Sequence, residues 1–295
     1  MRWKHGRRSD NIEDLRNSGG PSMAMGGAGM LFRIVPFLLR TKFGRILLLI
    51  GVVGYFGAKF LGVDLLQLAA PTNTGSASSQ QLSAKDQELA EFVSVVLADT
   101  ESTWHREFKK LGLTYQEPKL VLFRNAVNSA CGYAQAAMGP FYCPGDQKLY
   151  IDLAFYEDMK NKLGAPGDFA QAYVIAHEVG HHVQTLLGTS AKVRQAQQQA
   201  SKAQANQLSV KQELQADCYA GIWGHYADTE RQMLEDGDIE EALNAASAIG
   251  DDKLQQQAGG TVRPESFTHG SSKQRVEWFK RGFEQGKVEV CNTFK

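Results

Sequence analysis

Three stretches of the chain differ sharply in how hydrophobic and polar residues are arranged. Residues 46–66 open with ILLLIGVVGYFGA and stay mostly apolar to the end of the stretch. Since about 20 apolar residues span a bilayer as a helix, this stretch predicts a transmembrane helix at 46–66. The next residues, 67–83, include the small and polar sequence PTNTGSASSQQLS and predict a flexible linker. The folded domain is therefore expected at 84–295.

Within residues 84–295, two different periodicities predict a mixed domain of helices and strands. Apolar residues three and four positions apart predict a helix over 84–110 behind a cap at Ser83, although its TEST sequence leaves a break into two helices open. Short runs rich in β-branched and aromatic residues predict strands at 119–124 and 147–153. Together these elements indicate the α+β fold class.

The helical pattern is clearest over residues 169–187, where apolar side chains recur three and four positions apart. Asp168 and Gln171 resemble a capping box at the start of this segment. Gly188 is a natural residue to end it. The sequence therefore predicts a helix with defined ends.

This helix carries the sequence HEVGHH. His177 and His181 are four residues apart, so both imidazoles lie on one side of the helix and can offer nitrogens to one Zn²⁺. Glu178 lies about 100° round the helix from His177, where it can reach a water at the metal without being a ligand. This is the HExxH arrangement, in which the metal lowers the pKa of water and the glutamate takes its proton. His182 faces away from the other two histidines, so a supporting or surface position suits it as well as a catalytic one.

A catalytic zinc normally has three protein ligands, so a third must come from elsewhere in the chain. The segment 211–227 is helical in pattern and places Glu213 and Asp217 four residues apart on one face. Glu213 as ligand and Asp217 as the carboxylate that orients a ligand histidine would complete the site. Two alternatives stay open: a solvated acidic face, or His225 as the third ligand.

The charges of the chain are divided unevenly along the sequence, although the formal net charge is zero. Residues 1–45 contain nine Lys or Arg and three Asp or Glu, which leaves the rest of the chain acidic. Positive residues before an apolar span predict that residues 1–45 form a basic cytoplasmic segment and that the domain is exported across the membrane. An acidic domain gives no reason to expect nucleic-acid binding.

Four cysteines, Cys131, Cys143, Cys218 and Cys291, all lie in the part of the chain that is expected to be exported. An even number of cysteines in an oxidising compartment predicts two disulfides. Three pairings are possible. The pairing of Cys131 with Cys143 is favoured because these residues flank a short Gly-containing excursion, which leaves Cys218 to pair with Cys291.

Four sequence motifs resemble one known family. HEVGHHVQ, ELQADCYAGIW, GPFYCPGDQKLYIDLAFY and ESFTHGSSKQRVEWF, in the order of that family, are similar to the neutral zinc metallopeptidases, membrane-anchored proteins of bacterial envelopes. The resemblance covers residues 85–294 and the anchor. More distantly, the same motifs are similar to membrane metallopeptidases of the CAAX-processing and stress-protease type, which have a minimal gluzincin fold.

The resemblance implies a zincin-like, minimal gluzincin domain that lies in the periplasm and is anchored in the bacterial inner membrane. It also implies roles for single residues. It implies Glu213 as third ligand, Asp217 as the carboxylate behind a ligand, and His269 as a group near the reacting carbonyl. Gly270 departs from the distant relatives, which usually have proline there. The single anchor also departs from their several membrane helices, so a membrane-protein substrate does not follow from the resemblance.

His269 can also be argued from its own surroundings. A zinc peptidase forms a tetrahedral oxyanion and benefits from a donor besides the metal. THGSSKQR is a loop followed by a helix, with Ser271 and Gln274 as cap signals, and such a loop can bring an imidazole to a pocket. Arg275 is interpreted as a brace for this loop, with a substrate carboxylate as its alternative partner.

These observations predict a zinc peptidase that hydrolyses peptide or protein substrates of the cell envelope, with Glu178 as general base. The alternative is a zinc-containing scaffold that binds an envelope component without cleaving it. The intact Glu178 argues against the scaffold, which needs ligands but no base. Substrate identity and oligomeric state are not indicated by the sequence.

Two further segments have a predicted form. One of the strands near 141–143 or 148–153 is expected to be the sheet edge on which an extended peptide aligns. The segment 192–207, rich in Gln, Ala and Lys, has few large apolar residues and predicts a solvated helix or a mobile insertion.

Overall fold

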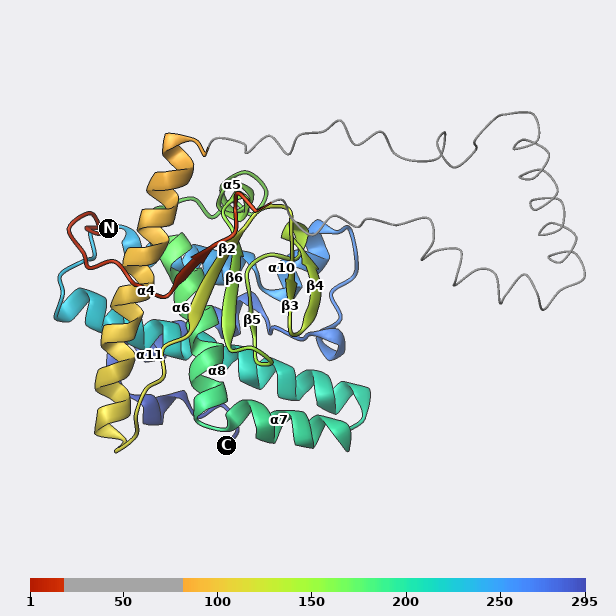
Figure 1. The fold of residues 1–295 in the computed structure, drawn as a ribbon. Coiled ribbons are helices and arrows are strands. Elements are labelled where there is room, and N and C mark those ends of the chain that lie inside the picture. Colours follow the sequence, from red (N-terminus) through yellow and green to blue (C-terminus); the bar gives the residue numbers. More distant parts are fainter. Residues whose placement is uncertain (19–81) are drawn as a thin grey trace, which may run out of the picture. The chain divides into compact units, whose positions relative to one another are not determined.

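A four-stranded sheet forms one layer of the protein in the computed structural model, which describes residues 1–18 and 82–295. The strands lie in the order β1 (Ile12–Asp14), β2 (Lys119–Phe123), β6 (Lys148–Asp152) and β5 (Phe141–Cys143). β1 and β2 run parallel, as do β2 and β6, whereas β5 runs antiparallel to β6. β5 is therefore an edge strand (Figure 1).

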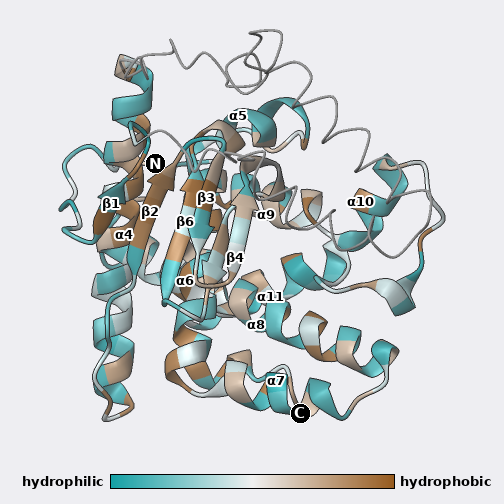
Figure 2. Ribbon diagram, turned by 45° about the vertical axis from the view of Figure 1, so that its right-hand side comes forward, coloured by the Kyte–Doolittle hydropathy of each residue, from teal (hydrophilic) through white to brown (hydrophobic). Residues whose placement is uncertain are grey.

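The two faces of the sheet are buried by different parts of the chain. Alternate residues of a strand point to opposite faces, and Leu120 and Leu122 of β2 join the main core with the helices. Val121 and Phe123 instead pack against the hairpin of β3 (Ala126–Ser129) and β4 (Gly132–Gln135). The predicted strands at 119–124 and 147–153 are confirmed to within one residue at each end. Hydrophobic residues concentrate in β2 and β6, as Figure 2 shows.

The helices form the second part of the fold. Following the order of the chain, they are α4 (Ala84–Lys110), α5 (Ala154–Asn161), α6 (Asp168–Leu186), α7 (Thr189–Gln198), α8 (Lys202–Thr229), α9 (Asp238–Ala248), α10 (Asp251–Gln257) and α11 (Ser272–Gln285). Short 3₁₀ turns cover Ala136–Met138, Pro264–Ser266 and Val288–Cys291. Helix α8 packs against α6, α7 and α11, so it is central among the helices. The mixture of helices and sheet confirms the α+β class.

Several predicted helices agree with the structure, and one predicted cap does not. α4 is a single helix with a capping box formed by Ser83 and Asp86, so the TEST sequence does not break it. Ser271 and Gln274 likewise form a capping box for α11. The capping box expected at Asp168 is absent: this carboxylate accepts hydrogen bonds from the Met1 ammonium, 2.9 Å and 3.0 Å away. The Asp168 side chain therefore pairs with Met1, which is distant in the sequence, instead of capping its own helix.

The N-terminal arm, residues 1–18, packs on the domain instead of forming part of a separate basic segment. β1 adds to the sheet beside β2, and the Trp3 ring lies edge-on against Phe92 of α4 with centroids 5.4 Å apart. Buried Glu101 accepts hydrogen bonds from Arg7 and Ser9. The boundary predicted after residue 45 is therefore wrong for the arm, because its basic residues pair with carboxylates of the domain.

This packing also bears on the predicted topology. Parts of one packed body lie on the same side of a membrane, whereas a single crossing between residues 18 and 82 would separate the arm from the domain. The expected cytoplasmic location of the arm therefore conflicts with an exported domain. Among the helices that the structure describes, none is long and apolar enough to span a bilayer. The predicted helix 46–66, the segment 19–45 and residues 67–81 of the predicted linker lie outside the described residues.

Both favoured disulfides are present. Cys131 bonds to Cys143, which joins the turn of the β3–β4 hairpin to the edge strand β5. Cys218 bonds to Cys291, which ties the C-terminal 3₁₀ turn to α8. Two disulfides and no free cysteine are typical of an oxidising, extracytoplasmic compartment.

Helices α8 and α11 approach each other closely at two glycines. A Cβ added to Gly282 would lie 1.9 Å from the carbonyl oxygen of Cys218, and one added to Gly221 would lie 2.1 Å from the carbonyl oxygen of Phe279. Only glycine permits this backbone contact. It holds α11 near the part of α8 that carries Asp217, and so brings Arg275 within reach of that carboxylate.

Candidate metal centre

Three side chains from two helices converge beside the edge strand. His177 and His181 come from α6, and Glu213 comes from α8. One donor atom of each lies within 4.8 Å of the others. His177 Nε2 is 3.1 Å and His181 Nε2 is 3.4 Å from oxygens of the Glu213 carboxylate. The spacing of four residues on α6 thus produces the shared face that the sequence predicts.

The second nitrogen of each imidazole has its own partner. His177 Nδ1 lies 2.8 Å from the Asp217 carboxylate, and His181 Nδ1 lies 2.9 Å from Gln184 Oε1. Such partners fix the ring orientation and leave Nε2 as the metal-facing nitrogen. Asp217 is predicted from the sequence, whereas Gln184 is not. The spacing along α6 could have indicated Gln184, because it follows His181 by three residues and residues three apart on a helix are neighbours.

Behind the histidines lies a buried network that we call the hub, formed by Tyr173, Asp217 and Arg275. Arg275 donates to both Asp217 oxygens, at 2.8 Å and 2.9 Å, and Tyr173 donates to the same carboxylate at 2.5 Å. Burial alone would raise the pKa of Asp217, but Arg275 and His177 outweigh it and hold the pKa at about 2. The carboxylate is therefore charged when it accepts from His177.

The contacts of Arg275 differ from those that were predicted from the sequence. It does not brace the loop around His269 through a side-chain contact; it forms an ion pair with Asp217 in the interior and is 2% exposed. Arg275 borders the cavity beside the histidines, but its guanidinium is already bonded to both oxygens of Asp217, which makes it a poor partner for a substrate carboxylate. Tyr173 was not singled out from the sequence, although it lies four residues before His177 and thus on the same face of α6.

Glu178 lies on the wall of a cavity of about 440 Å³ that also contains the three convergent side chains. It belongs to α6 but not to the donor cluster. Burial is the main cause that raises its pKa above the ordinary glutamate value, although both neighbouring histidines oppose this shift. A raised pKa makes the Glu178 carboxylate a better proton acceptor than an ordinary glutamate.

His269 lines the same cavity from the loop that precedes α11. Asp251 holds this loop: one carboxylate oxygen accepts from the backbone N–H groups of Thr268, His269 and Gly270 at 2.6–3.1 Å. The other oxygen lies 3.2 Å from His269 Nδ1. The imidazole is half exposed, so it can meet a bound molecule. Nothing in the local sequence indicated Asp251, which reaches the loop from α10.

The two remaining histidines on these helices lie away from the cluster. His182 is buried between the backbone carbonyl of Gln116, 2.7 Å from Nε2, and the hydroxyl of Tyr142. Burial lowers its pKa. His225 contacts the carbonyl oxygen of Phe283 at 2.7 Å and is absent from the cluster, so the structure places Glu213 and not His225 beside the two ligand candidates.

The HExxH helix, the carboxylate from a following helix and the mixed sheet define the zincin-like class of metallopeptidase domains. The chain belongs to the family described as "Putative neutral zinc metallopeptidase", whose model matches residues 1–294.

Known relatives of the chain come from several bacteria. It is 57% identical over 296 residues to the protein YpfJ of Escherichia coli strain K12, an alignment that covers 100% of this chain and 99% of YpfJ. It is 42% identical over 213 residues to Rv2575 of Mycobacterium tuberculosis, covering 69% of this chain and 71% of that protein. No solved structure shows significant similarity to the chain.

Proposed function

We propose that this protein is a zinc-dependent peptidase that hydrolyses peptide bonds in proteins or peptides of the cell envelope. The observation that carries the proposal is the convergence of His177, His181 and Glu213 within 4.8 Å, with Glu178 beside them and outside the cluster. Ligands alone would suit a structural zinc. A separate buried carboxylate on the same cavity supports hydrolysis.

The donor set fits zinc. Two imidazoles and one carboxylate are a common ligand set of catalytic zinc, which keeps a position open for water or substrate. Both imidazoles have a partner at Nδ1, so each can present Nε2 without losing its orientation. A zinc ion held there would supply Lewis acidity and would lower the pKa of a bound water to about 7.

Glu178 is the proton carrier in this proposal. Its buried carboxylate accepts a proton from the attacking water and then delivers it to the nitrogen of the departing amine, so one side chain acts first as base and then as acid. The raised pKa of Glu178 favours both directions of transfer.

His269 is proposed to donate a hydrogen bond to the oxyanion that develops on the scissile carbonyl. Asp251 fixes both the loop backbone and the imidazole, so this donor needs little reorganisation. The free edge of β5 is proposed to align an extended peptide through backbone hydrogen bonds, since Phe141 and Tyr142 line the cavity of the site.

The experiment that tests the function compares the zinc-loaded parent chain with Glu178→Gln on an unstructured protein. Glu178→Gln should keep zinc while hydrolysis falls by about 10² to 10⁴, the loss typical of a general base. The exposed Glu277→Gln on α11 is the matched control and should cleave at the parent rate. Equal cleavage by Glu178→Gln would refute its role, and binding of a partner without cleavage by any variant would favour the scaffold.

Metal analysis gives a second test, independent of activity. The parent chain should bind about one zinc, and both His177→Ala and Glu213→Ala should lose it. Full zinc occupancy in Glu213→Ala would show that Glu213 is not a ligand.

The proposed location is an extracytoplasmic compartment at the bacterial membrane, with attachment through the apolar stretch 46–66. The disulfides support the compartment, and the apolar character of that stretch supports attachment; because the arm and the domain pack as one body, this attachment leaves both on the same side of the membrane. Membrane fractions should contain the parent chain, and deletion of 46–66 should release it. Four alkylatable thiols in protein from an undisturbed envelope would contradict an oxidising location.

A further inference from the structure

A second cavity adjoins the metal centre on the side of α7. It has a volume of about 260 Å³ and shares Tyr142, His181 and Glu213 with the 440 Å³ cavity described above. We call it the α7 cavity. The candidate metal ligands therefore stand between two spaces, and a peptide cleaved there would extend into both.

The α7 cavity has one basic side chain in its wall, Arg194 of α7, which is exposed. Among the described residues, no carboxylate oxygen lies within ion-pair distance of its guanidinium. Of the residues in the described part of the chain that form this wall, Glu213 alone has a carboxylate, and it faces the two histidines. Residues 189–212 contain four Lys or Arg and no Asp or Glu, so the walls beyond Glu213 offer no counter-charge to Arg194.

Other polar groups of this wall already have partners within the α7–α8 hairpin. Gln197 donates to the carbonyl of Ala205 and to Ser209, and Gln212 donates to Ser190. These bonds fix the hairpin, which the sequence identified only as a Gln- and Ala-rich segment. Arg194 is thus the charged group left to meet a ligand in a wall that is otherwise internally bonded.

We propose that Arg194 selects substrates with an aspartate or glutamate shortly before the scissile bond. The direction follows from β5. Tyr142 lines both cavities, whereas Pro144 lines only the α7 cavity and Met138 only the larger one. A peptide that pairs antiparallel to β5 runs from the Pro144 end to the Met138 end, so its residues before the scissile bond enter the α7 cavity. This inference rests on the proposed function.

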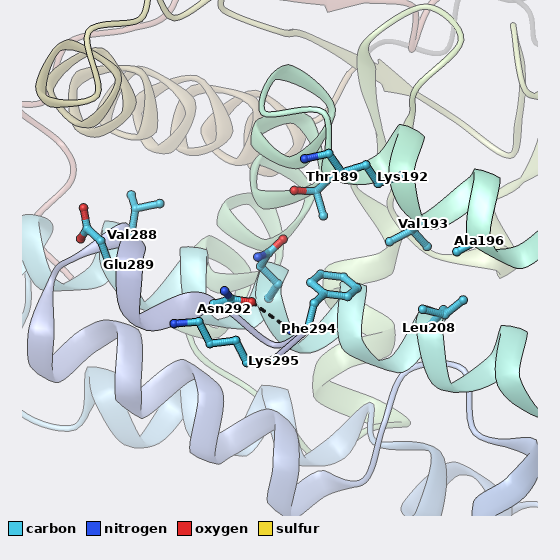
Figure 3. Close-up of a pocket in the computed structure, with 11 residues that line it drawn as sticks. Thr189, Lys192, Val193, Ala196, Leu208, Val288, Glu289, Asn292, Phe294 and Lys295 are labelled. Atoms are coloured by element: carbon cyan, nitrogen blue, oxygen red, sulfur yellow. Dashed lines mark hydrogen bonds between the residues drawn. The ribbon is translucent and has the colours of Figure 1, made fainter.

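Lys192 provides a matched control, because it lies on the same helix but in a different cavity. It lines a space of about 680 Å³. Figure 3 shows Lys192 among the residues that line this space, together with Val193, Leu208 and Phe294. Charge reversal at Lys192 changes the net charge of the protein as much as reversal at Arg194 does, but it leaves the α7 cavity intact.

The test uses the zinc-loaded full chain and a synthetic library of unstructured peptides whose products are identified by mass spectrometry. Asp and Glu should be enriched before the cleaved bonds. For a matched peptide pair with Glu or Gln at the enriched position, kcat/KM should favour Glu about fivefold, as for an exposed ion pair. The preference should shrink with added salt, vanish in Arg194→Gln, turn toward Lys in Arg194→Glu, and persist in Lys192→Glu.

A binding measurement separates this inference from the proposed function. Zinc-loaded Glu178→Gln should bind the Glu peptide more tightly than the Gln peptide in fluorescence anisotropy, and adding Arg194→Gln should abolish the difference. If no variant cleaves but this difference holds, the hydrolytic function fails and the role of Arg194 stands. Equal binding, acidic residues after the bond, or an unchanged preference in Arg194→Glu overturns the inference. A membrane role for the α7–α8 hairpin would also overturn the inference. In that case Arg194→Glu and Lys192→Glu would both lose binding to anionic lipid vesicles, while the preference for acidic peptides would stay unchanged.

Discussion

The hub and the His269 loop support the same site in opposite ways. The hub of Tyr173, Asp217 and Arg275 is completely enclosed, and its members come from three helices. The loop is half exposed and depends on a single carboxylate, Asp251. A buried ionic network makes ligand position and fold stability inseparable, whereas a loop held at the surface lets a functional side chain be tuned with little effect on the core.

The largest effect should come from breaking the hub. Arg275→Leu removes the guanidinium that neutralises the buried Asp217 carboxylate and leaves it only the hydrogen bonds of Tyr173 and His177, which should lower the free energy of unfolding by about 3–5 kcal/mol and weaken zinc binding through His177. Urea denaturation and metal analysis measure both. Arg281→Leu, on the exposed part of the same helix, should change stability by less than about 1 kcal/mol. Equal free energies of unfolding for the two variants would mean that the hub does not stabilise the fold.

The disulfide beside the hub gives the next effect. Replacing Cys218 and Cys291 by alanine should cost roughly 2–4 kcal/mol, and more than replacing Cys131 and Cys143, because the loops they close span 73 and 12 residues. The comparison is made by thermal or urea unfolding of the two double variants. A larger cost for the short loop would show that local strain, not chain entropy, dominates.

On the loop, His269→Ala should affect activity and not stability. An oxyanion donor acts chiefly in the transition state, so kcat should fall by about a hundredfold, which is about 3 kcal/mol, with little change in KM. Zinc content and unfolding midpoint should match the parent. A rise in KM at constant kcat would instead assign His269 to substrate binding.

The smallest effect concerns pH. The hydrogen bond to Asp251 raises the pKa of His269 above its ordinary value, so the imidazolium, the stronger donor, persists to higher pH. Activity from this donor, and the stability of the pair, are complete below the ordinary histidine pKa and are lost as pH rises through the raised one. Asp251→Asn should therefore move the alkaline limb of kcat to lower pH. The control variant is Asp252→Asn. It should leave the alkaline limb of kcat unchanged, because the Asp252 carboxylate accepts from Ser272 and not from His269.

The contrast also explains what the sequence could and could not predict. His177, Glu178 and His181 follow from helical spacing on one segment, and the disulfides follow from a count and a short excursion. Asp217 could be predicted because it lies four residues from Glu213 on a second helix. Asp251 could not be found, because its contact with the loop depends on how α10 and α11 are placed. The predictions of a cap at Asp168 and of the N-terminal boundary were wrong for the same reason. The residues that contact Asp168 and the arm are distant from them in the sequence.

The N-terminal arm has a consequence for the order in which the chain folds. Asn11 of the arm bonds to Glu117, 106 residues further along, and β1 pairs with β2 in the same region. Contacts that close so long a loop form slowly. The arm is therefore expected to be among the last segments to dock. Until the arm docks, the edge of β2 that it covers stays unpaired, and an open strand edge is a template for pairing with another chain. Docking of the arm is therefore expected to end a period in which the folding chain is prone to aggregation.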